Sequence, residues 1–267
     1  MKPIDALRPP LIIAHRGDSA RAPENTLIAF QRAVASGADG VEFDVRLAAD
    51  GVPVVFHDPS LDRIAGVKGK VAEFTSEELR RLDAGSWFNR RRPRHAEEAF
   101  VGEGIPTLAE TLGSLGGYGG LVYVELKCRE QDVERLTAAV CDAVNGSPLL
   151  PRVVVKSFKL RALSRSKDLL PGIRTAALFA PKIRNILRTN KHMLSLAEAA
   201  RADEISVHYT LATRKLTGEA RRRGLEVVIW TADNVRWVAR GTDLGLKAII
   251  TNAPAKLLAE RDMLISR

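Results

Sequence analysis

Ionisable side chains lie in pairs at or near the ends of four short, apolar segments of the chain. The pairs are His15 with Arg16, Glu42 with Asp44, His57 with Asp58, and Glu125 with Lys127. Alternate residues of a β-strand point to the same face, so the pairs that are spaced by two residues would share one face of a strand. Ionisable groups are costly to bury among apolar strands. Four such pairs together favour a functional site over separate surface ion pairs.

These residue types indicate phosphodiester chemistry. Carboxylates without clustered thiolates favour a hard cation such as Mg²⁺ or Ca²⁺ over zinc. Beside that cation, Arg16 and Lys127 would neutralise a phosphate and polarise its P–O bonds. His15 and His57, one accepting and one donating a proton, would then displace an alcohol from a phosphodiester. We therefore expect a small anionic substrate, and the residue pattern leaves open which histidine acts first as the base.

Alternating strand and helix patterns must position these residues. The expected strands are 11–15, 40–45, 52–57, 121–127, 153–158, 173–179, 204–208, 225–231 and 247–251. The expected helices are 26–36, 107–115, 130–144, 159–167, 195–201, 214–223, 234–240 and 255–262. Strand–helix repetition predicts parallel strands that are joined by right-handed crossovers. Eight such units in about 250 residues predict a (β/α)8 TIM barrel, in which catalytic residues gather at the carboxyl ends of the strands.

Two segments depart from this regular repeat. The strands at 40–45 and 52–57 flank Asp50-Gly51, a hairpin signal, which favours one bent element over two barrel strands. Residues 59–105 fit no single loop between a strand and a helix. We expect residues 59–105 to be a small insertion after the second strand, on the active-site face of a single domain that spans residues 1–267.

The composition is typical of a folded domain, with 45% hydrophobic and 27% charged residues in a chain of 267. No apolar run approaches the roughly 18 residues of a membrane helix. Residues 1–10 lack the apolar stretch of a secretory signal, which predicts a cytoplasmic protein without stable membrane insertion. The first predicted turn, residues 14–18, lacks the G-x-G-x-x-G pattern of dinucleotide-binding folds.

The formal net charge of +9 favours an anionic partner. A dense basic run at 90–95 lies close to Trp87 and Phe88, a combination that also occurs in proteins that bind single-stranded nucleic acid. One short basic run is more typical of a solvated loop, so we expect no nucleic-acid partner. No pattern in the sequence indicates an oligomeric state.

Segments spread over most of the chain resemble the glycerophosphodiester phosphodiesterases. In order, these segments are 13–17 (IAHRG), 22–26 (APENT), 41–45 (VEFDV), 55–58 (VFHD), 124–127 (VELK), 156–158 (KSF) and 229–231 (IWT). Each segment alone is a weak signal, whereas their combination in this order is highly specific.

The resemblance implies a (β/α)8 barrel with an insertion after the second strand. It also implies metal-dependent hydrolysis of glycerophosphodiesters to glycerol 3-phosphate and an alcohol. Attack by the glycerol 2-hydroxyl, through a cyclic phosphate, stays open as one route. The implied roles are metal binding by Glu42, Asp44 and Glu125, acid–base catalysis by His15 and His57, phosphate binding by Arg16 and Lys127, and shaping of the substrate mouth by Trp230.

The chain departs from the family pattern near its end. Asn252 stands where Asp usually follows Thr, and Lys247 stands where an acidic residue is common. Both departures are expected to lie outside the proposed metal and histidine set. They leave the last loop, more than the activity, open to question.

Two alternative functions remain. One is a phospholipase-like diesterase that acts on lipid head groups and is anchored to an anionic surface by residues 90–94. The insertion shows neither a clear amphipathic helix nor a lipid-anchor motif, which argues against this function. The other is a non-catalytic anion-binding barrel, against which the intact set of histidines and carboxylates argues.

Overall fold

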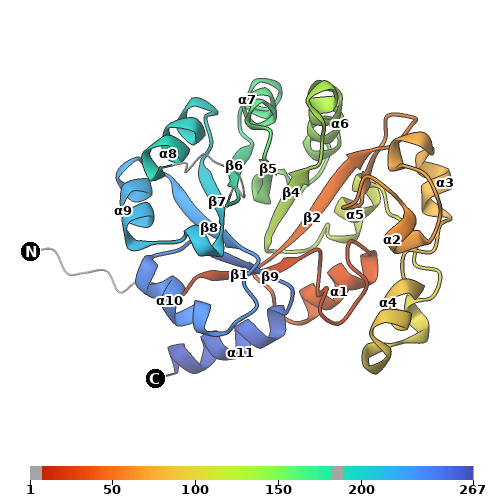
Figure 1. The fold of residues 1–267 in the computed structure, drawn as a ribbon, viewed down its shortest axis with the longest axis horizontal. Coiled ribbons are helices and arrows are strands. Elements are labelled where there is room, and N and C mark those ends of the chain that lie inside the picture. Colours follow the sequence, from red (N-terminus) through yellow and green to blue (C-terminus); the bar gives the residue numbers. More distant parts are fainter. Residues whose placement is uncertain (1–7, 182–188, 267) are drawn as a thin grey trace, which may run out of the picture.

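A closed barrel of parallel strands forms the centre of the molecule (Figure 1). The computed structural model describes residues 8–181 and 189–266. The barrel strands are β1 (Leu11–His15), β2 (Gly40–Leu47), β4 (Leu121–Leu126), β5 (Val153–Ser157), β6 (Arg174–Phe179), β7 (Glu204–His208), β8 (Glu226–Trp230) and β9 (Ala248–Thr251). Because β1 pairs in parallel with both β9 and β2, the sheet closes on itself. The predicted (β/α)8 fold is confirmed.

Helices cover the outside of the barrel (Figure 1). They are α1 (Leu27–Ala35), α5 (Leu108–Ser114), α6 (Val133–Asn145), α7 (Leu160–Leu169), α8 (Asn190–Ala199), α9 (Arg214–Arg222), α10 (Arg236–Leu244) and α11 (Pro254–Ile265). Strands that are buried on both faces are expected to be almost continuously apolar, as β9 is. Alternate strand residues, including Ile13, Tyr123 and Val228, fill the barrel interior, and the intervening ones pack against the helices.

The chain leaves the barrel after β2. β3 (Pro53–Val55) pairs antiparallel with the end of β2 and stands outside the closed ring. Gly51 adopts a φ of +83° in the connecting turn, a left-handed conformation that glycine adopts without steric cost. The two segments therefore form one hairpin, as the Asp50-Gly51 signal predicts.

Residues 59–105 follow this hairpin as the insertion before α5. They contain the helices α2 (Asp62–Ala65), α3 (Ser76–Arg80) and α4 (Ser86–Arg91) and the 3-10 turns η1 (Val71–Glu73), η2 (Pro93–His95) and η3 (Glu98–Phe100). A short helical pattern at 76–82 predicts α3. Helices α2 and α4 are not predicted from the sequence, because helices of four and six residues are too short to show a helical period.

Helix α8 begins at Asn190 rather than at the predicted Ser195. Thr189 caps the helix, and its hydroxyl accepts a hydrogen bond from the backbone N–H of His192 at 3.2 Å. The first turn consists of polar residues, so the apolar period that signals a helix is absent there.

An ion-pair cluster centred on the buried Glu204 lies at the amino-terminal end of the barrel. Glu204 pairs with Arg174 at 3.1 Å and with Lys247 at 2.7 Å, and it accepts a hydrogen bond from the Tyr123 hydroxyl at 3.0 Å. Lys247 also pairs with Glu226 at 2.7 Å. The departure from the family pattern at Lys247 therefore lies at the opposite end of the barrel from the predicted site.

Among the described residues, no helix is both long and apolar enough to cross a membrane. Residues 1–7 belong to the amino-terminal stretch from which a cytoplasmic location is predicted, and they lie outside the described residues.

Candidate active site

The three predicted metal ligands lie together at the carboxyl end of the barrel. Glu42 and Asp44 project from β2, and Glu125 projects from the adjacent β4, where it is the register partner of Asp44. All three side chains are buried, and one oxygen of each lies within 4.8 Å of the other two. Adjacent parallel strands thus bring together residues that are far apart in the sequence.

The two predicted phosphate-binding residues pair with these carboxylates. Arg16 Nε lies 3.0 Å from Asp44 Oδ2, and Lys127 Nζ lies 3.2 Å from Asp44 Oδ1 and 2.5 Å from Glu125 Oε1. Burial alone would raise the pKa of Asp44, but Arg16 and Lys127 outweigh it and hold the pKa of that carboxyl well below its usual range. Asp44 is therefore ionised at neutral pH, as a metal ligand must be.

Lys156 also belongs to this cluster, although it is not among the predicted site residues. Its ammonium group lies 2.7 Å from Glu42 Oε1 and 3.5 Å from Glu125 Oε2, and the residue is 1% exposed. The signal was present in the sequence, because Lys156 lies within an otherwise apolar strand. A buried lysine in that setting requires a carboxylate partner.

The carboxylate cluster fits a hard divalent cation. One oxygen each of Glu42, Asp44 and Glu125 is buried, and the ammonium groups of Lys156 and Lys127 supply the positive charge beside these oxygens. The three donors are all carboxylate oxygens, the ligands that Mg²⁺ and Ca²⁺ prefer. These residues therefore suit either ion.

A chain of hydrogen bonds orients His15 at the end of β1. Its Nδ1 lies 2.7 Å from Asn252 Oδ1, and the Asn252 amide nitrogen donates to Asp233 at 2.8 Å. A carboxylate only accepts, so Asp233 fixes the Asn252 amide, and Nδ1 of His15 must carry a proton. Nε2, which lies 3.9 Å from Glu42, is then the basic nitrogen. Burial lowers the pKa of His15 and outweighs the neighbouring carboxylates, which favours the neutral ring.

The expectation that Asn252 lies outside the histidine set is wrong. Asn252 contacts His15 directly, and its Oδ1 also accepts a hydrogen bond from Ser19 at 3.0 Å. The residue follows β9, which pairs with β1, so closure of the barrel brings the two ends of the chain together. A contact that spans 237 positions leaves no local pattern in the sequence.

His57 lies at the start of a second chain of polar contacts. Its Nδ1 lies 2.6 Å from Asp58 Oδ1, and Arg63 of the insertion pairs with Asp58 at 2.5 Å and with Glu24 at 2.8 Å. Because the Asp58 carboxylate accepts the Nδ1 proton, Nε2 of His57 is the nitrogen left to exchange a proton. The imidazole is 32% exposed, so this exchange is open to a ligand.

The loop before α1 does more than cap that helix. Thr26 is the N-cap, and its hydroxyl accepts a hydrogen bond from the backbone N–H of Ala29. Glu24 and Asn25, which precede this cap, contact the site. Asn25 donates a hydrogen bond to Asp44 at 3.1 Å, and Glu24 pairs with Arg16 at 2.7 Å. This loop therefore holds both Asp44 and Arg16 in position.

A cavity of about 530 Å³ is shared by the two histidines. Its lining combines residues of the barrel ends with residues of the insertion, namely His15, Arg16, Glu24, His57, Asp58, Arg63, Trp87, Phe88, Arg91, Arg92, Asp233 and Asn252. The insertion thus forms part of the wall beside the histidines.

Trp230 does not line this cavity. It ends β8, and its Nε1 donates to the Ser206 carbonyl at 3.1 Å. Its ring packs edge-on against Phe158, with centroids 5.7 Å apart, and against His208, with centroids 5.5 Å apart. The aromatic cluster lies at the same end of the barrel as the carboxylates, but the structure does not place Trp230 against His15 or His57.

Comparison with protein families gives a match over nearly the whole chain. Residues 15–256 match the model of the glycerophosphoryl diester phosphodiesterase family. This range includes every residue of the candidate site described above.

Individual relatives match over similar lengths. A Bacillus subtilis protein is 35% identical over 249 residues, which cover 91% of this chain and 94% of that protein. A glycerophosphodiester phosphodiesterase of Caldanaerobacter subterraneus is 34% identical over 250 residues, which cover 93% of this chain and 96% of that protein. Among solved structures, a phosphodiesterase of Oleispira antarctica in complex with the product sn-glycerol-3-phosphate has a TM-score of 0.83 and 29% identity, and the match covers 95% of this chain and 97% of that one.

Proposed function

The chain belongs to the glycerophosphoryl diester phosphodiesterase family, and we propose that it hydrolyses glycerophosphodiesters to glycerol 3-phosphate and an alcohol by histidine acid–base catalysis beside a divalent metal ion. The observation that carries this proposal is the buried cluster of Glu42, Asp44 and Glu125, which lies next to His15. His57 shares a cavity with His15. The product bound to the Oleispira antarctica relative supports the choice of product.

Glu42, Asp44 and Glu125 would hold the ion, either Mg²⁺ or Ca²⁺. When bound, the ion supplies positive charge that polarises the phosphate. Arg16 and Lys127, which lie beside the same carboxylates, would contact the phosphate oxygens and neutralise their charge. Such fixed cations stabilise the charge that develops on the phosphoryl oxygens in the transition state.

His15 and His57 would exchange protons with the attacking and the leaving oxygen. Nε2 of His15 is suited to take the proton of the attacking hydroxyl, because Nδ1 already carries a proton that is held by Asn252. Nε2 of His57 would protonate the leaving alcohol, and Asp58 would stabilise the charged ring before that transfer. A bond forms from the attacking oxygen to phosphorus while the bond from phosphorus to the alcohol oxygen breaks. The attacking group is either water, which gives glycerol 3-phosphate directly, or the glycerol 2-hydroxyl, which gives a cyclic phosphate that water must then open to glycerol 3-phosphate.

The aromatic cluster of Trp230, Phe158 and His208 would form one wall of the substrate mouth. These side chains come from the carboxyl ends of β5, β7 and β8, the end of the barrel that carries the carboxylates. Aromatic rings of this kind bind the carbon skeleton of a ligand while polar groups orient it.

We expect the purified protein to release glycerol 3-phosphate from soluble glycerophosphocholine, as measured by an enzyme-coupled assay of that product. The same protein should leave phospholipid vesicles intact. Hydrolysis of vesicles but not of the soluble diester would favour the phospholipase-like alternative. Failure to hydrolyse any diester, together with salt-sensitive nucleic-acid binding that survives chelation, would favour a non-catalytic anion binder.

Two arginines of the insertion should select for the alcohol part of the diester. Arg91 and Arg92 line the histidine cavity, and neither forms an ion pair with another described residue. We expect an R91A/R92A variant to lose about tenfold or more in kcat/KM for a diester whose alcohol carries a second phosphate, because hydrogen bonds to charged groups contribute roughly 1.5–3 kcal/mol. Its kcat/KM for glycerophosphoglycerol, whose alcohol is neutral, should change little.

Arg90 and Arg94 provide a matched control for this test, since both are exposed in the same basic run and neither lines the cavity. An R90A/R94A variant removes the same charge and should keep the wild-type preference. Equal losses in both double variants would show that general surface charge, rather than the cavity wall, determines the preference.

A further inference from the structure

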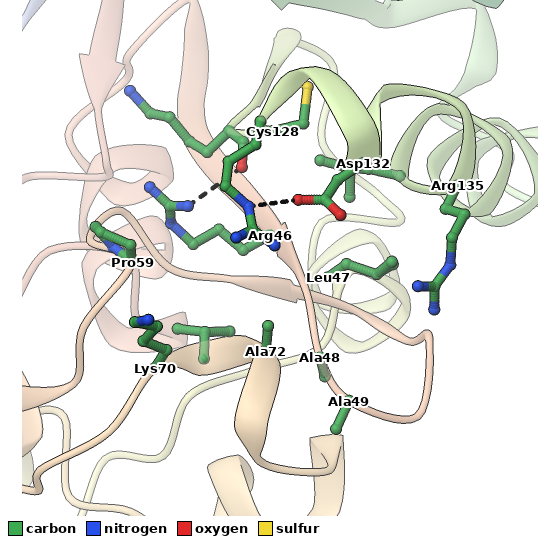
Figure 2. A pocket seen from close by; sticks show the side chains of 14 residues that line it. Arg46, Leu47, Ala48, Ala49, Pro59, Lys70, Ala72, Cys128, Asp132 and Arg135 are labelled. Carbon is green, nitrogen blue, oxygen red and sulfur yellow. Dashed lines mark hydrogen bonds and ion pairs between the residues drawn. The ribbon is translucent and has the colours of Figure 1, made fainter.

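A second cavity, of about 470 Å³, lies beside the active site (Figure 2). It is bounded on one side by the β2–β3 hairpin and η1, and on the other side by the loop from β4 to α6. Leu47, Ala48, Pro59, Val71 and Leu136 give it an apolar wall. Neither histidine lines this cavity, so it is separate from the histidine cavity described above.

The polar lining of this second cavity is strongly basic. One acidic residue, Asp132, accompanies five basic ones, which are Arg46, Lys70, Lys127, Arg129 and Arg135. Arg129 pairs with Asp132 at 2.9 Å, and the Lys127 ammonium pairs with carboxylates inside the barrel. The charged groups of Arg46, Lys70 and Arg135 form no ion pair with a carboxylate among residues 8–181 and 189–266, although Glu73 accepts a hydrogen bond from the backbone N–H of Lys70 at 2.8 Å. An excess of unpaired cations around one concave surface creates a positive potential that attracts anions.

Arg46 is the least expected of these cations, because it is half-buried and lacks an acidic partner. Burial is the largest influence on its pKa and lowers it, against the opposing effect of more distant carboxylates. Its Nε donates to the backbone carbonyl of His57 at 2.7 Å, and a terminal nitrogen donates to the carbonyl of Lys127 at 3.2 Å. One guanidinium group therefore contacts both the second cavity and the backbone of two candidate active-site residues.

In Figure 2, Lys70 of the insertion lies below Arg46, and Arg135 of α6 lies to the right, beyond Asp132. Both of these side chains are exposed, so they can reorient towards a ligand. Phosphate groups suit such a site, since several cations can share the charge of one phosphate and donate to its three or four oxygens. The apolar wall would contact the carbon skeleton of a phosphate ester.

We propose that this second cavity binds the phosphate group of a small molecule, and that Arg46 couples its occupancy to the active site. An anion held by Lys70 and Arg135 would draw the Arg46 guanidinium towards the cavity and change its hydrogen bonds to His57 and Lys127. The binding site stands on its own geometry, whereas the coupling rests on the proposed function, because that function assigns roles to His57 and Lys127.

Calorimetric titration with inorganic phosphate tests the binding site without relying on turnover. We expect the wild type to bind two phosphates per chain, one in the histidine cavity and one in the second cavity. The K70A/R135A variant should bind one, or bind the second at least about tenfold more weakly, which corresponds to 1.4 kcal/mol. A K215A/R222A variant, which removes two exposed cations from α9, should still bind two. A single site in the wild type, or two unchanged sites in K70A/R135A, would overturn the proposal.

Titration with glycerol 3-phosphate identifies the source of the phosphate group. Tighter binding of this ester than of inorganic phosphate at the site removed by K70A/R135A would assign the cavity to a phosphate ester. Equal or weaker binding there would assign it to free phosphate. Either result supports a phosphate site. If neither inorganic phosphate nor glycerol 3-phosphate binds detectably there, the proposal is contradicted.

Kinetics in the presence of inorganic phosphate test the coupling. Phosphate in the histidine cavity competes with substrate and raises KM, whereas phosphate in the second cavity should change kcat. We expect both effects in the wild type and the KM effect alone in K70A/R135A. A kcat that does not respond to phosphate would disprove the coupling. An absence of turnover on every diester would contradict the proposed function instead. The number of phosphates bound per chain would still show whether the second cavity is a phosphate site.

Discussion

Replacing His15 or His57 with alanine should lower kcat for diester hydrolysis by about 10²–10⁴-fold, the contribution that a positioned general acid or base typically makes. Each substitution removes the one ring nitrogen that is poised to exchange a proton on its side of the cavity. KM should change far less, since Arg16 and Lys127, rather than the imidazoles, would bind the phosphate. Steady-state kinetics on one soluble diester measure both constants.

His192 supplies the control for these two variants. It is exposed on α8 and lines neither cavity described here, so His192→Ala should keep the wild-type kcat. Thermal unfolding of all three variants shows whether the fold survives. A folded His15→Ala or His57→Ala protein with a kcat within about threefold of the wild type would exclude that histidine from proton transfer.

The three carboxylates that the sequence pattern expects to lie together, and that the structure brings together, share a simple physical property. Glu42, Asp44 and Glu125 interrupt apolar strands with charge, and in a parallel barrel the carboxyl ends of such strands must converge. The order of the strands and the two-residue spacing of side chains on one strand face are enough to place the three carboxylates together. Lys156 obeys the same rule, so the same reasoning could have identified it.

Asn252 and Glu24 illustrate what the sequence cannot provide. Both lie in loops, where no period relates one residue to another, and their contacts with His15 and Arg16 depend on how the loops pack. The insertion poses the same difficulty, because Arg63 reaches Asp58 and Glu24 only after short, irregular helices have folded onto the barrel. Loop contacts of this kind become visible only in the tertiary structure.

Removal of the divalent metal ion is the second change that should greatly lower the rate of diester hydrolysis. Dialysis against EDTA should lower kcat/KM by about 10³-fold or more, because Lewis-acid stabilisation contributes several kcal/mol and each 1.36 kcal/mol is a factor of ten. Addition of Mg²⁺ or Ca²⁺ should restore the activity. Undiminished hydrolysis in EDTA would eliminate the metal from the proposed function.

Metal binding itself can be measured apart from turnover. Asp44→Asn removes one negative charge from between Arg16 and Lys127, so the remaining cations would repel an incoming divalent ion. We expect calorimetry to show at least about a hundredfold weaker binding of Mg²⁺ or Ca²⁺. Loss of a residue that only hydrogen-bonds to a metal ligand already weakens metal binding by up to about a hundredfold, and Asp44 would be a ligand itself. Asp142→Asn, an exposed change on α6, removes the same charge and should bind the ion normally. If Asp44→Asn stays folded and binds the ion as tightly as the wild type, the three carboxylates are not its ligands, and their charge then serves only to hold Arg16, Lys127 and Lys156 in place.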